Sequence, residues 1–106
     1  MNKLFGFLLV LFIIFNCVLH AQWIQTSGPA SSNVYGFVSC PNGSGNSNLF
    51  ACSPNSGIFL STNNGASWSQ VNNGLTRTDV YSLSVSPDGA TIYAGTGGVG
   101  IFVSTN

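Results

Sequence analysis

Apolar and polar residues alternate along several short stretches of this chain, and each stretch is bounded by residues that favour turns. At 80–85, Tyr81, Leu83 and Val85 alternate with serines, as expected for a β-strand with one buried face. The segment SPDG follows at 86–89 and suits a tight turn. Further strands are predicted at 34–40, 48–53, 68–71, 92–96 and 101–105. The pattern therefore predicts an all-β fold.

The same pattern occurs twice along the chain. NLFACSPNSGIFLSTN at 48–63 aligns with TIYAGTGGVGIFVSTN at 91–106, and VYGFVSCPNG at 34–43 aligns with VYSLSVSPDG at 80–89. The extra residues of the first copy lie in the turn SGNSN, where an exposed loop tolerates an insertion. About four short antiparallel strands in a repeat of roughly 40 to 45 residues are typical of a β-propeller blade.

The repeat sets the expected domain boundaries. We expect one blade at about 29–74 and a second, incomplete blade at about 75–106, together forming a partial propeller over 22–106. WIQTSG at 23–28 is similar to WSQVNNG at 68–74, so the first of these segments is predicted to be a closing fourth strand. Because the second copy stops in mid-blade, the chain is interpreted as the N-terminal portion of a longer protein.

The turn between the third and fourth strands of the first repeat carries a motif, STNNGASW at 61–68. Ser61 and Asn63 have short side chains that can hydrogen-bond nearby backbone amides. Gly65 can adopt a positive φ, and Trp68 can cover the turn. The motif resembles the Asp-box, S-x-D-x-G-x-x-W, of the bacterial neuraminidase repeat (BNR) family. Asn63 stands where that family prefers aspartate, which argues against calcium binding.

The resemblance implies a structural role for the motif. It also suggests which functions the chain could have. Similar repeats occur in sortilin-type receptors, in sialidases and in many exported bacterial proteins. On this basis the chain is expected to be a non-catalytic binding or scaffold module. Its partners would be a protein or glycan held at the loop ends and the remaining blades of the full-length protein. The alternative is the N-terminal fragment of a glycoside hydrolase of sialidase or xyloglucanase type, with its catalytic residues elsewhere.

Residues 1–21 form a separate segment. Lys3 precedes an apolar run from Leu4 to Val18, which is several residues short of the ~20 that span a membrane. A short basic start followed by an apolar run predicts a signal peptide, here cleaved after Ala21. A membrane anchor is the alternative. The prediction implies a secreted or cell-surface protein exported through the general secretory pathway.

Charged residues are scarce after position 21, where the Lys, Arg, His, Asp and Glu residues are Arg77, Asp79 and Asp88. One arginine cannot neutralise a phosphate backbone, so nucleic acid is excluded as a partner. No histidine or lysine is present in this part to activate a nucleophile. Asp88 is interpreted as a turn residue and Asp79 as a structural partner of Arg77. The sequence therefore predicts no catalytic residue, no cofactor and no metal site.

Cys40 and Cys52 could form a disulfide in an exported protein. If 34–40 and 48–53 form a hairpin, Cys52 lies opposite about Phe37, and Cys40 lies opposite about Leu49. The sulfurs would then be ~10 Å apart, beyond the reach of a disulfide. Two cysteines without a histidine do not make a zinc ligand set either. Two free, half-buried thiols are the favoured interpretation.

Overall fold

Seven β-strands form in the computed structural model, which describes residues 22–30 and 32–105, and this part of the chain contains no helix. The strands are β1 (Gly36–Pro41), β2 (Ser47–Ser53), β3 (Gly57–Ser61), β4 (Ser69–Gln70), β5 (Val80–Val85), β6 (Ile92–Thr96) and β7 (Ile101–Ser104). The predicted all-β fold is confirmed. The predicted signal peptide at 1–21 lies outside the described residues.

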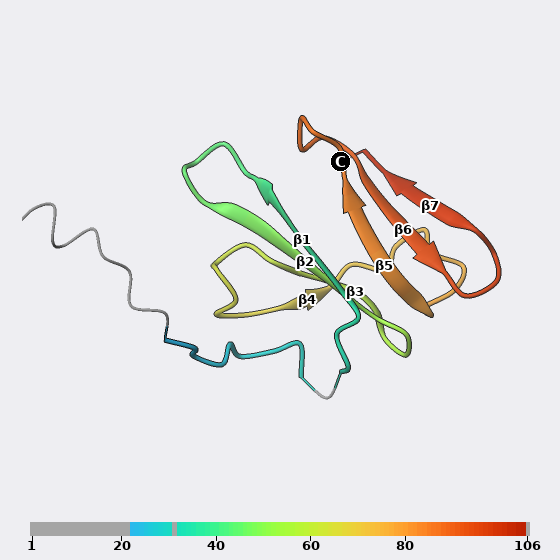
Figure 1. Ribbon diagram of the computed structural model, residues 1–106, viewed down its shortest axis with the longest axis horizontal. Helices are drawn as coiled ribbons and strands as arrows, with labels where there is room; N and C mark the ends of the chain where they lie inside the picture. Colours follow the sequence, from blue (N-terminus) through green and yellow to red (C-terminus); the bar gives the residue numbers. More distant parts are fainter. Residues whose placement is uncertain (1–21, 31, 106) are drawn as a thin grey trace, which may run out of the picture.

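The strands form two antiparallel sheets, one for each sequence repeat (Figure 1). The first sheet has the order β1-β2-β3-β4 and the second has the order β5-β6-β7. Neighbouring strands in each sheet are also neighbours in sequence, so short turns suffice to connect them. No helix in the described part of the chain is long and apolar enough to cross a membrane.

The turn between β5 and β6 forms as the sequence predicts. The backbone N–H of Gly89 donates to the carbonyl of Ser86 at 2.9 Å, and that of Ser86 donates to the carbonyl of Thr91 at 2.9 Å. Gly89 has a φ of 73°, a value that glycine adopts without steric cost. The glycine-rich segment at 97–100 likewise connects β6 to β7 as a bend between strands.

The core lies between the two sheets, where β5 packs against β1 and β2. Its buried members are Cys52, Ile58, Val80 and Ala94, with Phe50, Val71, Leu75, Leu83 and Phe102 packed against them. The sheets lie close together at Gly36. A Cβ at this position would lie 2.7 Å from the sulfur of Cys52 and 3.1 Å from the backbone nitrogen of Leu83.

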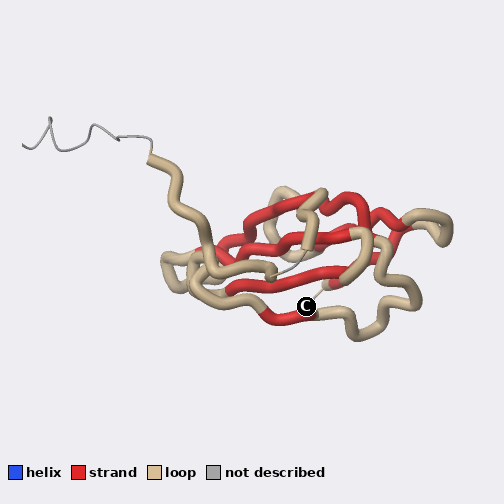
Figure 2. The backbone as a smooth tube through the Cα atoms, turned by 90° about the horizontal axis from the view of Figure 1, so that it is seen from below, coloured by secondary structure: helices blue, strands red, loops and turns tan. Residues whose placement is uncertain are grey.

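The strands lie roughly along one common axis, and the turns gather at its two ends (Figure 2). The end at which β1 and β5 begin, called the tyrosine end below, comprises residues 32–35, 53–57, 71–79 and 96–100. The opposite end, called the motif end, comprises residues 42–46, 62–68 and 86–91. This division decides which loop residues can act together.

Residues 22–28, which were predicted to be a fourth strand that closes the ring with a later blade, form no strand here. The segment lies against the first sheet instead. The N–H of Ser27 donates to the carbonyl of Gly65 at 3.2 Å, and the hydroxyl of Ser32 contacts that of Ser56 at 3.4 Å. Ser27 and Ser32 therefore contact the two turns that flank β3. Trp23 precedes this contact and is 95% exposed.

Candidate functional site

Side-chain hydrogen bonds in the turn from β3 to β4 join three of the four motif residues, Ser61, Asn63 and Gly65, to one another and to Ser67. The hydroxyl of Ser61 accepts the buried N–H of Gly65 at 2.8 Å and donates to Oδ1 of Asn63 at 3.0 Å. The same Oδ1 accepts the N–H of Ser67 at 2.9 Å. Gly65 has a φ of 87°. These contacts fix the backbone of the turn and leave no acidic group in it.

Asn63 uses both ends of its amide, which accounts for asparagine at this position. Its Nδ2 donates to the hydroxyl of Ser67 at 2.8 Å, while its Oδ1 accepts two hydrogen bonds. An aspartate would keep the acceptor contacts and lose this donor. The turn is therefore held by neutral groups.

Trp68 is partly buried beside the segment that precedes the first sheet. A Cβ on Gly28 would lie 3.1 Å from Cδ1 of the Trp68 ring. The ring therefore lies against Gly28. Its Nε1 is buried without a hydrogen-bond partner among the described residues.

The two carboxylates lie at opposite ends of β5. Asp79 precedes the strand and accepts two hydrogen bonds from Arg77, at 3.1 Å from Nε and 2.9 Å from Nη2. Asp88 follows the strand and accepts the N–H of Ala90 at 3.1 Å. The strand between them has six residues and is about 20 Å long. Glycosidase carboxyl pairs lie about 5 to 10 Å apart, so these two residues do not form such a pair.

Both carboxyl groups are held in the ionised form by local hydrogen bonds. The side chain of Arg77 is the main cause of the lowered pKa of Asp79. The hydroxyl of Ser86 is the main cause of the lowered pKa of Asp88, followed by the N–H of Ala90. A general acid would need a raised pKa, and neither residue has one.

Two tyrosines meet at the tyrosine end. The rings of Tyr35 and Tyr81 lie edge to face, with centroids 5.8 Å apart and an interplanar angle of 72°. They are 60% and 48% exposed, respectively. The two residues occupy equivalent positions in the repeats, one before β1 and one in β5. They join the two sheets at this edge and present aromatic surface to solvent.

Gly97 completes this cluster. A Cβ on it would lie 2.7 Å from Cε2 of Tyr81 and 2.8 Å from Oδ2 of Asp79. Its N–H donates to the carbonyl of Asp79 at 3.1 Å. The bend after β6 therefore packs against the aromatic ring and the ion pair. The tyrosine end thus carries two exposed phenols and the Arg77–Asp79 ion pair in one place.

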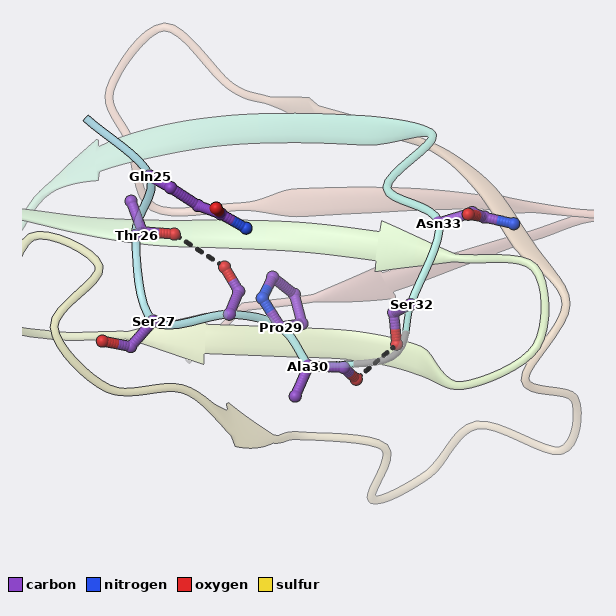
Figure 3. A pocket seen from close by; sticks show the side chains of 8 residues that line it. Gln25, Thr26, Ser27, Pro29, Ala30, Ser32 and Asn33 are labelled. Carbon is purple, nitrogen blue, oxygen red and sulfur yellow. Dashed lines mark hydrogen bonds between the residues drawn. The ribbon is translucent and has the colours of Figure 1, made fainter. Parts of the chain in front are cut away.

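Two hollows lie elsewhere on the molecule. One, of about 490 Å³, is formed by the segment before β1 and is lined by Gln25–Ala30, Ser32 and Asn33. Figure 3 shows the hydroxyls of Thr26 and Ser32 bonded to backbone carbonyls within this segment. The other, of about 610 Å³, is a groove between the sheets with Phe50, Leu60 and Ile92 in its walls. Neither hollow is lined by a Lys, Arg, Asp, Glu or His residue.

Cys40 and Cys52 are buried, free thiols. Gly36 lies opposite Cys52, and Asn48 lies opposite Cys40, so the pairing is one residue away from the predicted register. Burial raises the pKa of both thiols. In the described residues no group of three or more His, Cys, Asp or Glu side chains could hold a metal ion.

Asn72 is a structural residue that sequence reasoning missed. Its Oδ1 accepts the N–H of Ile58 at 2.7 Å, and its Nδ2 donates to the carbonyl of Ser56 at 2.9 Å. The side chain thereby fastens the β2–β3 turn to the segment that follows β4. The sequence shows only NNG at this point, and either asparagine could serve as a turn residue.

Comparisons with family models, curated proteins and solved structures found no match for this chain.

Proposed function

We propose that this chain is a non-catalytic binding or scaffold module of an exported protein, built from β-propeller-type repeats, and that its partner contacts the tyrosine end. The observation that carries the proposal is the exposed pair Tyr35 and Tyr81 beside the Arg77–Asp79 ion pair. Tyrosine and arginine are enriched at protein interfaces, and Tyr presents a large contact area with only two rotatable side-chain angles.

The repeat architecture supports the propeller part of the proposal. Each sequence repeat corresponds to one antiparallel sheet, and the two sheets pack face to face. Their first strands, β1 and β5, lie next to each other. The hydrogen bonds of the β3–β4 turn suit an Asp-box that acts as a structural turn. The position of the turn also supports a binding site elsewhere, because it lies at the end opposite the tyrosines.

The proposal can be tested by comparing three forms of the chain. Wild type, the double variant Tyr35→Ala/Tyr81→Ala and the control Tyr93→Ala would be tested on a panel of oligosaccharides and against cell-surface extract, with retained material quantified. Tyr93 is an exposed tyrosine on the second sheet. We expect a partner that wild type and Tyr93→Ala retain and that the double variant loses by at least about tenfold. Equal retention by all three forms would contradict a site at the tyrosine end.

A further inference from the structure

Asparagine is followed by glycine at three places in the sequence, Asn42–Gly43, Asn64–Gly65 and Asn73–Gly74. Such a pair can react without an enzyme. The glycine nitrogen attacks Cγ of the asparagine, a C–N bond forms, and the side-chain nitrogen leaves as ammonia. Water then opens the resulting succinimide ring at either carbonyl and leaves aspartate or isoaspartate. Glycine favours the attack because it has no side chain that shields its nitrogen.

Two local conditions decide which of the three pairs reacts in the folded chain. The glycine N–H must be free, because it gives up its proton to solvent base as the nitrogen attacks. The asparagine side chain must also be free to turn toward that nitrogen, and hydrogen bonds to its amide prevent this. Each hydrogen bond that has to break first raises the barrier and slows the reaction. The three turns differ in both respects.

The pair Asn64–Gly65, in the turn from β3 to β4, does not meet the first condition. The N–H of Gly65 donates to the hydroxyl of Ser61 at 2.8 Å, and Gly65 is buried. Thr26 covers this glycine, because a Cβ built on it would lie 2.8 Å from Cγ2 of Thr26. Asn64 is exposed, but the nitrogen that would attack it is held and shielded. We therefore expect this pair to react slowly.

The pair Asn42–Gly43, in the turn from β1 to β2, does not meet the second condition. Gly43 is exposed and has open space around it. However, Oδ1 of Asn42 accepts the N–H of Ser44 at 3.0 Å and its hydroxyl at 2.6 Å. Nδ2 of Asn42 lies 3.5 Å from Oδ1 of Asn48. These contacts hold the side chain of Asn42 away from the attacking nitrogen, so this pair should also react slowly.

The pair Asn73–Gly74, after β4, meets both conditions. Both residues are exposed. Within the described part of the chain, neither the side chain of Asn73 nor the N–H of Gly74 makes a hydrogen bond. A Cβ on Gly74 would meet no atom within 4 Å, so water reaches this position. The N–H of Leu75 closes the turn by donating to the carbonyl of Asn72 at 3.0 Å, and this bond involves neither reacting group.

We propose that Asn73 is a site of spontaneous deamidation in the folded chain, and that it reacts ahead of Asn42 and Asn64. One asparagine and one water give one aspartate or isoaspartate and one ammonia, so the reaction needs no oxidant, reductant or cofactor. The proposal rests on the hydrogen bonds and exposure of three turns. It holds whether or not a partner contacts the tyrosine end.

The product changes the charge of the tyrosine end, to which residues 71–79 belong. After residue 21 the chain carries one arginine and two aspartates, a net charge of about −1 at neutral pH. Conversion of Asn73 adds a carboxylate and makes this charge about −2. Isoelectric focusing therefore separates the modified chain from the unmodified one.

The test compares the three asparagines within the same purified chain. Folded chain and chain in guanidinium chloride are incubated at mildly alkaline pH and digested with chymotrypsin, and tandem mass spectrometry locates each replacement of –NH2 by –OH. In the folded chain, Asn73 should react at least about fivefold faster than Asn42 or Asn64, the effect of one hydrogen bond that need not break. In guanidinium chloride the three rates should converge, because the turns that distinguish them are lost.

Asn73→Gln is the variant that checks the assignment. Glutamine keeps an exposed amide, but its cyclisation needs a larger ring and is much slower, so the acidic band should not appear while wild type acidifies. Asn55→Gln is the matched control, since Asn55 is exposed at the same end of the molecule and is followed by Ser56. This variant should acidify as wild type does. Equal or faster reaction at Asn42 or Asn64 in the folded chain, or an unchanged acidic band in Asn73→Gln, would overturn the proposal.

Discussion

The hydroxyl of Ser61 is the acceptor for the N–H of Gly65, and both residues are buried. Ser61→Ala would leave that amide without its partner, which costs about 1–3 kcal/mol. We expect the free energy of unfolding to fall by this amount in urea denaturation. Ser39→Ala, an exposed serine on β1, should change it by less than about 0.5 kcal/mol. Equal effects of the two substitutions would show that the turn does not depend on this hydrogen bond.

Asp79 and Asp88 make stability depend on acid pH. Both have a lowered pKa in the folded chain, so each stabilises the fold above its unfolded pKa, and that stabilisation is lost as the pH falls through the folded pKa. Stability should therefore decline below about pH 4 and stay level from about pH 5 to 8. The urea concentration at the midpoint of unfolding should therefore fall less between about pH 5 and pH 3 in the double variant Asp79→Asn/Asp88→Asn than in wild type. An identical acid decline in the double variant would contradict the assignment.

At the scale of single residues, local contacts could be predicted and distant ones could not. Ser61 and Asn63 bond within their own turn, so the spacing in the sequence reveals the partners. Asn72 reaches back fourteen residues to Ile58, and the contact between Tyr35 and Tyr81 depends on how the sheets pack. The spacing of residues in the sequence predicts neither the Asn72–Ile58 hydrogen bond nor the Tyr35–Tyr81 ring contact.

The β1–β2 hairpin shows the same limit at the scale of elements. Alternation located both strands, but the pairing differs from the prediction by one residue because the length of the turn was unknown. The turn spans 42–46 and closes with a hydrogen bond from the N–H of Asn42 to the carbonyl of Asn46 at 3.2 Å. A shift of one residue changes which side chains lie opposite each other.

The segment 22–28 is an element that the similarity to 68–74 predicted as a strand. A strand needs a partner edge, and residues 26–28 instead lie against the β3–β4 turn, where Thr26 would meet a Cβ placed on Gly65. The local sequence pattern does not reveal this contact, because Thr26 and Gly65 are far apart in the sequence.

Packing between the sheets depends on the absence of a side chain at Gly36. Gly36→Val would place atoms against Cys52 and the backbone of Leu83 and force the sheets apart. We expect a loss of about 1–3 kcal/mol in the free energy of unfolding, a typical cost of overpacking. The exposed residue Ser84 of β5 serves as the control, since Ser84→Val should change stability by less than about 0.5 kcal/mol. No loss in Gly36→Val would mean that the sheets are further apart.

At the scale of the whole molecule, export is a testable part of the proposed function. Expression of the chain in a bacterium should yield a product outside the cytoplasm whose first residue is Gln22, because cleavage is proposed after Ala21. Amino-terminal sequencing and intact mass measure this directly. Substitution of Leu8 and Leu9 by Arg would interrupt the apolar run and should leave the chain uncleaved. A product that retains Met1 in both forms would contradict export by this route.

The arrangement of the two sheets is the feature on which the account of the whole molecule depends. The repeat in the sequence predicted two similar units, but which faces meet follows from side-chain burial that only the folded chain shows. Methyl–methyl nuclear Overhauser effects in the purified chain test this packing most directly. The account predicts cross-peaks from Ile58 to Val80 and Ala94, which share its core. Cross-peaks confined to residues within each sheet would contradict it.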